Sequence, residues 1–187
     1  MQPPDRERLG AYLGLLGLHR GDGVTAYDAA AEAYDGFARV WDDHIAAPAL
    51  AQFNTLVAQH LRPGASVLDA GAGTGERTRV LLRHGAIDRV VALDGSHAML
   101  ALAERKLRDP RVAFVRGDVT RLPFPDNSFD LVASTWVVET LDDPRSAVRE
   151  FVRVLRPEGI AVYAFCSLPE GIGGALLKRV IELAAPD

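Results

Sequence analysis

Short apolar runs alternate with amphipathic segments along most of the chain. Near-continuous apolar runs predict strands at residues 66–71, 89–94, 111–118, 128–135 and 159–166. Apolar residues three and four positions apart predict helices between them, at residues 75–85, 96–107 and 143–157. Apolar strands separated by helices are typical of a parallel sheet covered on both faces. The pattern therefore predicts an α/β fold, doubly wound and Rossmann-like, with a mostly parallel sheet.

Residues that favour helix ends bound these predicted helices. Ser96 is the expected N-cap of the helix at 96–107, and Gly85 is the expected C-terminal cap of the helix at 75–85. Pro144 falls in the first turn of the last helix and Pro157 beyond its end. We therefore expect short, sharply bounded helices between the strands.

Upstream of the first strand, residues 25–43 and 48–61 predict two amphipathic helices, the first of them rich in alanine. Residues 173–187 predict a helix at the other end of the chain. We expect one domain over residues 1–187, because this length suits a single core. Within it, we predict an N-terminal helical lid segment at 1–62 and a Rossmann-like core at 63–187.

Composition narrows the function classes. With 48% hydrophobic and 25% charged residues, the chain resembles ordinary globular proteins, and no apolar run approaches the roughly 18 residues of a membrane span. A net charge of −4 and scattered arginines argue against a nucleic-acid surface and favour a small-molecule ligand. Residues 9–18 have the length of a signal-peptide core but lack its charge pattern and cleavage site, so we interpret them as a short packed helix. Cys166, the single cysteine, has no disulfide partner and lies in an apolar run, so we expect a buried thiol and a cytoplasmic protein.

The first predicted strand leads into a glycine-rich turn, in the sequence VLDAGAGTGERT at residues 67–78. Asp69 precedes the three glycines Gly71, Gly73 and Gly75. Glycines at a strand-to-helix turn permit positive φ and let a ligand approach the main chain. Alone, this run is a weak indication of a ligand site.

Acidic residues also follow the next two predicted strands. Asp94 lies about 20 residues after the glycines, the spacing at which dinucleotide folds place a carboxylate on the ribose hydroxyls. Asp118 ends the third strand, where its carboxylate suits an exocyclic amine such as that of adenine, with the Val119 N–H beside it. Each acid alone is equally well a solvated strand end or a helix cap. Together with Asp69 and the glycines, they predict a nucleoside site at one edge of the sheet.

Four segments then resemble a known family: VLDAGAGTGERT, VVALDGSHAML, GDVTRLPFPDNSFDLV and LRPEGIAVYAF. In order and spacing they look like the motifs of class I S-adenosylmethionine-dependent methyltransferases, small-molecule branch, similar to ubiquinone/menaquinone C-methyltransferases. The resemblance covers about residues 60–166. It implies S-adenosylmethionine as cofactor, S-adenosylhomocysteine as product and no metal.

The resemblance also implies roles for individual residues. It places the glycines against the methionine part of the cofactor, Asp94 on the ribose and Asp118 on the adenine edge. The full cofactor-binding set that it implies is Asp69, Gly71, Gly73, Gly75, Asp94, Gly95, Met99, Asp118, Val119, Ser134, Thr135 and Trp136. A nicotinamide dinucleotide is the less favoured alternative, because its G-x-G-x-x-G fingerprint differs from the G-x-G-x-G found here, and Asp69 would repel a pyrophosphate.

Methyl transfer is an in-line displacement whose acceleration can come from alignment in a closed, dry site, so a base is optional. The candidates on the acceptor side are Glu139, Tyr27, Tyr34, His19 and His44. The family often has His near position 139, where this chain has Glu, so no catalytic residue is carried over. Tyr27 and Tyr34 belong to the segment that resembles the family's lid, and simple packing on the sheet explains them equally well.

The family's sheet usually gains an antiparallel hairpin after the fifth strand and its helix, and this sequence has no counterpart of it. We therefore expect either a truncated protein or another chain that covers the edge of the fifth strand, and thus either a homodimer or an exposed sheet edge. Two function classes follow: a small-molecule methyltransferase, and a cofactor-binding partner or regulatory protein without catalysis. Turnover with candidate acceptors distinguishes them.

Overall fold

A five-stranded sheet forms the centre of residues 23–165, which the computed structural model describes. Its strands run in the order β3-β2-β1-β4-β5, and every neighbouring pair is parallel. The strands are β1 (Ala65–Ala70), β2 (Ile87–Asp94), β3 (Val112–Arg116), β4 (Phe129–Thr135) and β5 (Leu155–Ala164). This confirms the predicted Rossmann-like fold. The strand order reverses beside β1, which creates a crevice at the carboxyl ends of the strands.

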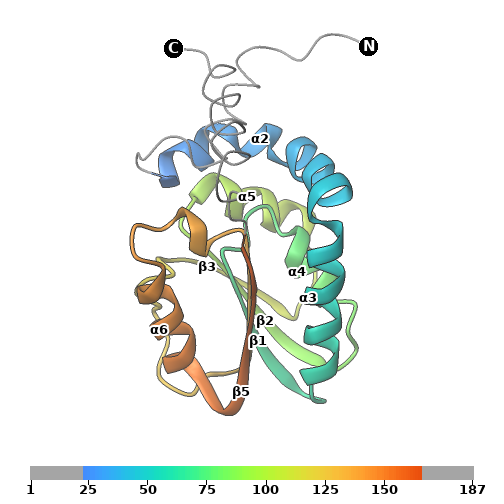
Figure 1. Cartoon of the computed structure of the whole chain (residues 1–187), viewed down its shortest axis with the longest axis vertical. Coiled ribbons are helices and arrows are strands. Elements are labelled where there is room, and N and C mark those ends of the chain that lie inside the picture. The colour runs from blue at the N-terminus through green and yellow to red at the C-terminus, as the bar shows by residue number, and fades with distance from the viewer. Residues whose placement is uncertain (1–22, 166–187) are drawn as a thin grey trace, which may run out of the picture.

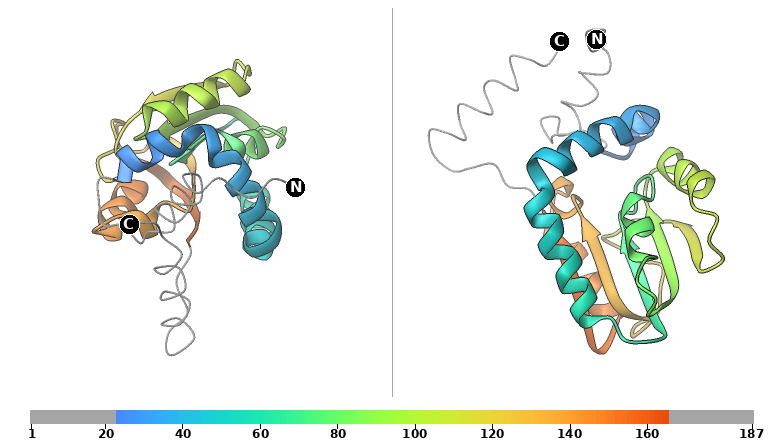
Figure 2. Two further views of the ribbon diagram at one scale, coloured as in Figure 1. Left: turned by 90° about the horizontal axis from the view of Figure 1, so that it is seen from above. Right: turned by 90° about the vertical axis from the view of Figure 1, so that its right-hand side faces the viewer.

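Helices cover both faces of the sheet and one end of it (Figure 1). They are α2 (Gly23–Trp41), α3 (Ala47–His60), α4 (Glu76–Leu81), α5 (His97–Lys106) and α6 (Pro144–Val154). Figure 2 shows α2 crossing over the sheet and α3 running down its side, as one bent helical segment. The bend falls at the π-helical turn η2 (Asp42–Ala46). This bend lets a single stretch of chain both pack on the sheet and cover the crevice.

Two apolar layers result from the alternation of side chains along the strands. Leu68 of β1 packs in one cluster with Phe151 of α6, and both side chains are fully buried. Its neighbour Val67 points to the opposite face, into a second cluster with Phe53 and Val57 of α3. The sheet is therefore covered on both faces, as its apolar strands predict.

The predicted helix ends are correct at Ser96 and Pro157 and wrong at Gly85. Ser96 caps α5, because its Oγ accepts a hydrogen bond from Met99 N at 3.1 Å. Gly85 does not cap α4, which already ends at Leu81. Pro157 lies beyond the end of α6 at Val154, as predicted, and falls inside β5, at a shift in the β4–β5 register where the next residue has a positive φ. A bulge of this kind tolerates a proline.

Several expectations fall outside residues 23–165: the helices at 9–18 and 173–187, His19 and Cys166. Between residues 23 and 165, no helix is both long and apolar enough to cross a bilayer.

Candidate functional site

A cavity of about 630 Å³ lies at the carboxyl ends of the strands and is closed on one side by α2. Its volume is in the ~300–1,000 Å³ range of small-molecule sites. It is lined by Val24, Tyr27, Tyr34, Gly71, Gly73, Asp94, Gly95, Ser96, Met99, Arg116, Gly117, Asp118, Val119, Thr135, Trp136, Val137 and Thr140. Most of the predicted site residues are in this set.

The glycine turn after β1 folds back over the end of β2. Gly71 N and Ala72 N donate hydrogen bonds to Leu93 O at 2.8 and 2.9 Å, and Gly71 and Gly73 have φ values of +81° and +54°. A Cβ on Gly71 would lie 2.1 Å from Val137 Cγ2, whereas a Cβ on Gly73 would meet nothing within 4 Å. Gly71 is thus required by packing, and Gly73 presents bare backbone to open space.

Asp94 is fixed at the end of β2 by two main-chain donors. Its Oδ2 accepts from Gly73 N at 2.7 Å and its Oδ1 from Ser96 N at 2.8 Å. Burial raises the pKa of Asp94, and these hydrogen bonds partly oppose the rise. The result is a half-buried carboxylate that joins the glycine turn to the start of α5 and faces the cavity.

Asp69 lies behind the cavity lining and is 1% exposed. Its Oδ2 accepts a hydrogen bond from Thr78 Oγ1 at 2.6 Å, while its buried Oδ1 has no partner. Burial raises the pKa of Asp69 to about 6, against the effects of Thr78 and Arg77. A buried carboxylate beneath the turn gives the adjacent part of the cavity a negative potential, which favours a cationic ligand.

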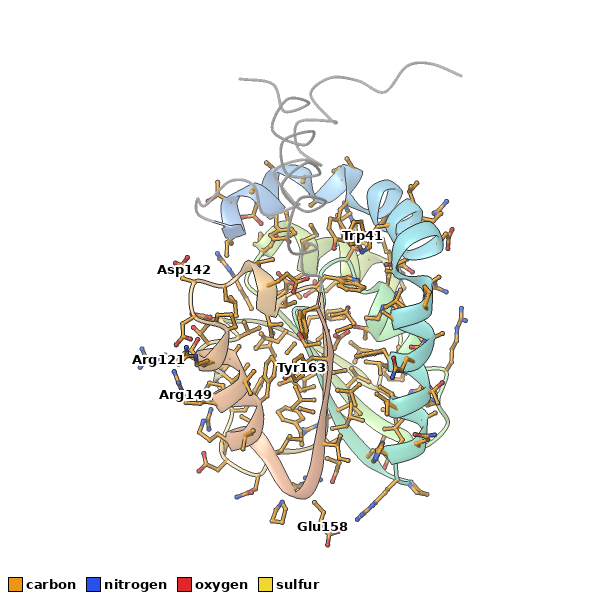
Figure 3. The ribbon with its side chains drawn as sticks, in the orientation of Figure 1. Trp41, Arg121, Asp142, Arg149, Glu158 and Tyr163 are labelled. Carbon is orange, nitrogen blue, oxygen red and sulfur yellow. The ribbon has the colours of Figure 1, made fainter. Side chains whose placement is uncertain are left out.

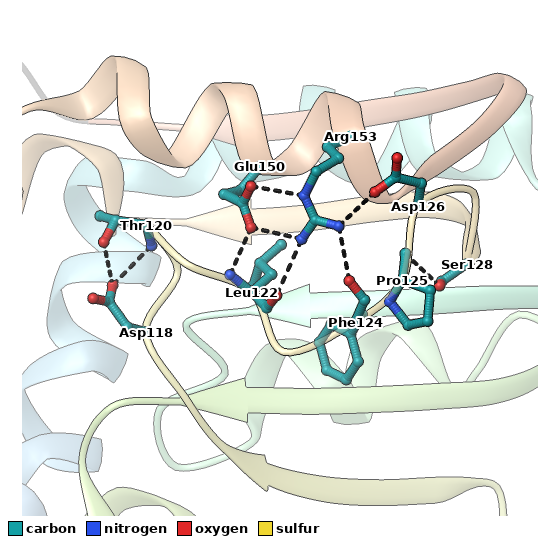
Figure 4. Close-up of polar contacts among 9 residues, drawn as sticks. All are labelled: Asp118, Thr120, Leu122, Phe124, Pro125, Asp126, Ser128, Glu150 and Arg153. Atoms are coloured by element: carbon teal, nitrogen blue, oxygen red, sulfur yellow. Dashed lines mark hydrogen bonds and ion pairs between the residues drawn. The ribbon is translucent and has the colours of Figure 1, made fainter.

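Asp118 and Val119 follow β3 and line the opposite part of the cavity. Asp118 is exposed, and its Oδ1 accepts from Thr120 N at 2.8 Å and from Thr120 Oγ1 at 2.7 Å (Figure 4). Both bonds use the same carboxylate oxygen. Val119 is 8% exposed and packs in the core. This local turn fixes how the end of β3 faces the cavity.

The loop that continues from Asp118 is fastened to α6 by Arg153 (Figure 4). The Arg153 guanidinium donates to Leu122 O at 3.1 Å, to Phe124 O at 2.8 Å and to both oxygens of Glu150. Glu150 in turn accepts from Leu122 N at 2.7 Å. One helix thereby holds the main chain of the loop, and sequence reasoning had assigned no role to either side chain.

At the end of β4, Thr135 and Trp136 line the cavity but Ser134 does not. The Ser134 hydroxyl instead donates to Ala70 O at 2.7 Å, across the strand pair. Trp136 has a φ of +61°, which is uncommon for a bulky residue. Its ring packs edge to face against that of Trp41, with the ring centroids 6.2 Å apart. Trp41 is the last residue of α2, at the bend toward α3 (Figure 3).

Tyr27 and Tyr34 reach the cavity from α2, with their rings 6.1 Å apart. Burial raises the pKa of Tyr27 to about 12, and Glu139 and Asp94 add to the rise. Burial also raises the pKa of Tyr34. Glu139 is exposed in the 3-10 turn η3 (Val138–Thr140) and is not in the lining. The side chain of His44 is outside those described. Among the acceptor-side candidates whose side chains are described, the two tyrosines line the cavity and Glu139 does not.

Acidic side chains of α2 fasten this helix over the site. Asp28 accepts from Ser96 Oγ at 2.5 Å and from Ala98 N at 3.1 Å, at the start of α5. Asp35 accepts from Thr74 Oγ1 in the glycine turn at 2.5 Å and pairs with Lys106. The helix is therefore tied to the same elements that hold Asp94.

Sequence reasoning missed six lining residues: Val24, Ser96, Arg116, Gly117, Val137 and Thr140. Ser96 and Gly117 are each within two residues of a predicted acid, so their position at a strand end was a usable signal. Val24 had none, because its helix reaches the site only through tertiary packing. Within residues 23–165, no group of three or more His, Cys, Asp or Glu side chains is arranged for a metal ion.

Comparison with known proteins identifies methyltransferases as the relatives of this chain. The sequence profile of the methyltransferase domain matches residues 68–163. A demethylmenaquinone methyltransferase of Renibacterium salmoninarum is 43% identical over 107 residues, which are 57% of this chain and 44% of that protein. A malonyl-[acyl-carrier protein] O-methyltransferase of Halorhodospira halophila is 39% identical over 142 residues, which are 74% of this chain and 46% of that protein.

Among solved structures, a chain of the complex between the Haloferax volcanii Trm112 methyltransferase activator and the putative methyltransferase matches with a TM-score of 0.60 and 29% identity. The match covers 72% of this chain and 57% of that chain. This chain spans about half the length of the curated relatives it matches. The profile nevertheless covers more than half of the chain, including the glycine turn, all of β2, β3 and β4, and parts of β1 and β5. The chain therefore belongs to the class I S-adenosylmethionine-dependent methyltransferases, whose cosubstrate is S-adenosylmethionine.

Proposed function

We propose that this chain binds S-adenosylmethionine in the cavity beneath α2 and transfers its methyl group to a small-molecule acceptor. The observation that carries the proposal is the pairing of Gly73 and Asp94. At Gly73 the main chain of the turn is open to the cavity, because no side chain covers it. The Gly73 N–H also donates a hydrogen bond of 2.7 Å to Asp94 Oδ2, which places the carboxylate beside the turn. A nucleoside needs both features, a close approach to the backbone and an acceptor for its hydroxyls.

The residues present fit this cosubstrate along its length. We assign Asp94 to the ribose hydroxyls and Asp118, with the Val119 N–H, to the edge of the adenine. Gly95 and Met99 flank the base in this assignment, and Thr135 and Trp136 lie toward the methyl group. The buried Oδ1 of Asp69 lacks a partner and supplies negative charge beneath the turn, which suits a cation. Gly75 and Ser134 act behind the lining: Gly75 packs beside Ala103, and Ser134 bonds Ala70.

When bound, S-adenosylmethionine supplies a methyl group activated by a positively charged sulfur. The chain's own part is to align the acceptor with that methyl group and to exclude water, for which α2 closes one side of the cavity. Tyr27, with a pKa of about 12, stays protonated at neutral pH, so its hydroxyl can serve a bound ligand as a hydrogen-bond donor. Because its pKa is also raised, Tyr34 behaves in the same way. Neither tyrosine is therefore assigned as a base, and Glu139 remains the candidate if the acceptor needs one.

We propose an aromatic, quinone-like acceptor. Two tyrosines and a tryptophan line the cavity, and aromatic side chains favour a flat, partly apolar ring. Relatives from Renibacterium salmoninarum and Clavibacter sepedonicus are named demethylmenaquinone methyltransferases. The Halorhodospira halophila relative is named for a malonyl-[acyl-carrier protein] acceptor instead, so acceptor assays should include both classes.

Calorimetry with S-adenosylhomocysteine, followed by turnover assays, tests this function. We expect saturable binding with one site per chain and formation of S-adenosylhomocysteine from S-adenosylmethionine when a quinone-like acceptor is present. Binding without turnover on any acceptor would favour the alternative, a cofactor-binding partner protein. Failure of wild-type protein to bind either nucleoside would refute both.

The organisation of the chain is also part of the proposal. We assign residues 1–62 to a helical lid segment and 63–187 to the core of one domain, and we propose a homodimer. Light scattering of the purified chain checks the dimer, since a monomer at micromolar concentration would contradict it.

A further inference from the structure

The chain between β3 and β4, residues 117–128, crosses one face of the sheet without a helix of its own. Crossovers between parallel strands usually contain a helix, whose main-chain groups bond to one another. In this crossover the main-chain groups need other partners. Side chains of α6 supply them, because α6 packs in the same apolar cluster as the crossover.

Arg153 of α6 uses all of its donors on this crossover and on Glu150 (Figure 4). Its Nη1 donates to Phe124 O and Asp126 Oδ1, both at 2.8 Å, and its Nη2 to Leu122 O at 3.1 Å. Its Nε and Nη2 also donate to the two oxygens of Glu150, at 2.8 and 2.7 Å. A guanidinium has five N–H groups, and each of them thus has an acceptor. The arrangement requires the planar fork of arginine, which an ammonium group lacks.

Glu150 holds the crossover at the same point. Its Oε2 accepts from Leu122 N at 2.7 Å, so both main-chain polar groups of Leu122 are bonded to side chains of α6. The hydrogen bonds from Arg153 hold the pKa of Glu150 below its usual value, so its carboxyl stays ionised at neutral pH. Glu150 and Arg153 thus form one unit, the α6 clamp, on this part of the crossover.

A tight turn joins the clamped segment to the cavity. Arg121 N donates to Asp118 O at 3.0 Å, so only this turn separates Leu122 from Asp118. Within the turn, Thr120 donates from its N and its Oγ1 to Asp118 Oδ1. The direction of the Asp118 carboxylate therefore depends on where the clamp holds Leu122.

Pro123 makes a second connection to the cavity lining. A Cβ on Gly117 would lie 3.4 Å from Pro123 Cδ, so the clamped segment packs against the residue before Asp118. Gly117 and Asp118 line the cavity, whereas the two clamp side chains do not. Any effect of the clamp on a ligand must then pass through the end of β3.

We propose that the α6 clamp determines how strictly the cavity selects its base, because it fixes the Asp118 carboxylate from outside the site. Glu150 and Arg153 are thus positioning residues. The inference rests on the proposed function, in which Asp118 meets the edge of the adenine. Without the clamp, the turn would take several orientations, and the carboxylate would no longer meet an exocyclic amine in one geometry.

Calorimetry of the full chain with two ligands tests the proposal. S-inosylhomocysteine differs from S-adenosylhomocysteine only in its base, where a carbonyl replaces the exocyclic amine. In wild-type protein we expect S-adenosylhomocysteine to bind at least tenfold more tightly, because the Asp118 carboxylate accepts from an amine and repels a carbonyl. Lost stability alone does not change this ratio, because a smaller folded fraction weakens the binding of both ligands equally.

Two conservative variants weaken the clamp. Arg153→Lys keeps the positive charge but has three donors in place of the planar fork, so it should reduce the ratio at least threefold. Glu150→Gln removes the charge that Arg153 and Leu122 N share, and we expect a reduction of the same size. Either variant alone gives the comparison if the other does not fold. Arg149→Lys is the matched control on the same helix and should keep the wild-type ratio, because its 69% exposed side chain makes one 3.3 Å pair with Asp143.

A double-mutant cycle separates positioning from a general structural role. Asp118→Asn keeps the oxygen that Thr120 bonds but removes the charge, so it should itself lower the ratio. Because the clamp acts through Asp118, adding Arg153→Lys to Asp118→Asn should change the ratio by less than twofold. A clamp that only stabilises the fold would have the same effect in both backgrounds.

The outcomes are distinguishable. The inference is overturned, while the proposed function stands, by a ratio near one in wild-type protein, by an unchanged ratio in a folded clamp variant, or by an undiminished effect of Arg153→Lys in the Asp118→Asn background. If wild-type protein binds neither ligand, the proposed function fails, and this inference fails with it. A ratio that falls in the clamp variants, stays constant in the control and no longer responds once Asp118 is neutral supports the assignment.

Discussion

Gly73 donates its main-chain N–H to Asp94 Oδ2 over 2.7 Å, and this bond joins the turn after β1 to the end of β2. The two residues are 21 positions apart in the sequence. Gly73 also has a positive φ, so the chain continues from this bond in a conformation that glycine adopts without steric cost. The hydrogen bond joins the shape of the turn to the position of the carboxylate that we assign to the ribose.

The first prediction concerns Asp94 itself. Asp94→Asn should weaken S-adenosylhomocysteine binding by about 10- to 100-fold, because hydrogen bonds to a charged acceptor contribute about 1.5–3 kcal/mol. Asp88→Asn is the matched control, an exposed acid on the same strand at its opposite end. Calorimetry of both variants checks the effect. Equal affinities would show that the nucleoside lies elsewhere.

The glycine turn allows a test that separates packing from ligand access. Gly71→Ala should lose about 2–4 kcal/mol of unfolding free energy, because its Cβ would overlap Val137 and φ is +81°. Gly73→Ala has open space for its Cβ, so only the positive φ costs stability, about 1 kcal/mol. That methyl group would project toward the ligand, so we expect a folded protein with at least tenfold weaker binding. Urea denaturation and calorimetry measure the two effects, and a folded Gly73→Ala variant with wild-type affinity would contradict the second.

Asp69 predicts a specific pH dependence of stability. Burial raises its pKa from 3.8 to about 6 in the folded protein, so between these values the folded state binds the proton more tightly than the unfolded state. The contribution of Asp69 to the free energy of unfolding therefore falls by about 3 kcal/mol as the pH rises from about 4 to about 6. Asp69→Asn should remove this dependence and gain stability relative to wild type over that range. Denaturation at pH 4, 5, 6 and 7 measures the difference, and a constant difference would contradict the assignment.

The contacts of α2 predict which acid holds the helix in place. Asp35 bonds Thr74 and Lys106 from a partly buried position, whereas Glu32 pairs with Arg105 through side chains that are 84% and 65% exposed. Asp35→Asn should speed amide exchange in α2 several-fold and weaken S-adenosylhomocysteine binding. Glu32→Gln should do neither, because exposed ion pairs contribute about 0–1 kcal/mol. Amide exchange measured by mass spectrometry tests this prediction. Identical exchange rates in α2 of the two variants would exclude this role for Asp35.

Arg153 should stabilise the loop after β3 far more than Arg149, which lies one turn earlier in α6. Arg153→Ala leaves the Leu122 and Phe124 carbonyls without their donor, so we expect a loss of about 1–3 kcal/mol of unfolding free energy and faster exchange at 120–128. Arg149→Ala removes one 3.3 Å pair of exposed groups and should stay within about 0.5 kcal/mol of wild type. Similar losses in the two variants would show that the network is not what holds the loop.

The sequence by itself determined the sheet and the place of the site. Apolar runs such as 89–94 predict buried strands, because a strand covered on both faces needs apolar side chains at every position. Parallel strands end at one edge, so the order of Asp69, Asp94 and Asp118 along the chain already placed them near one another. These features depend on local pattern and chain order, which a sequence contains directly.

Only the tertiary structure decided which of these three acids line the cavity. Asp69 ends a strand like Asp94, yet it lies behind the lining with one oxygen unpaired, because the turn folds over it. The α6 clamp on Leu122 joins two distant segments, and no sequence spacing relates them. Gly85 was wrong as a helix boundary, because α4 already ends at Leu81. Side-chain direction and long-range pairing depend on how elements pack, and packing is set by the whole chain at once.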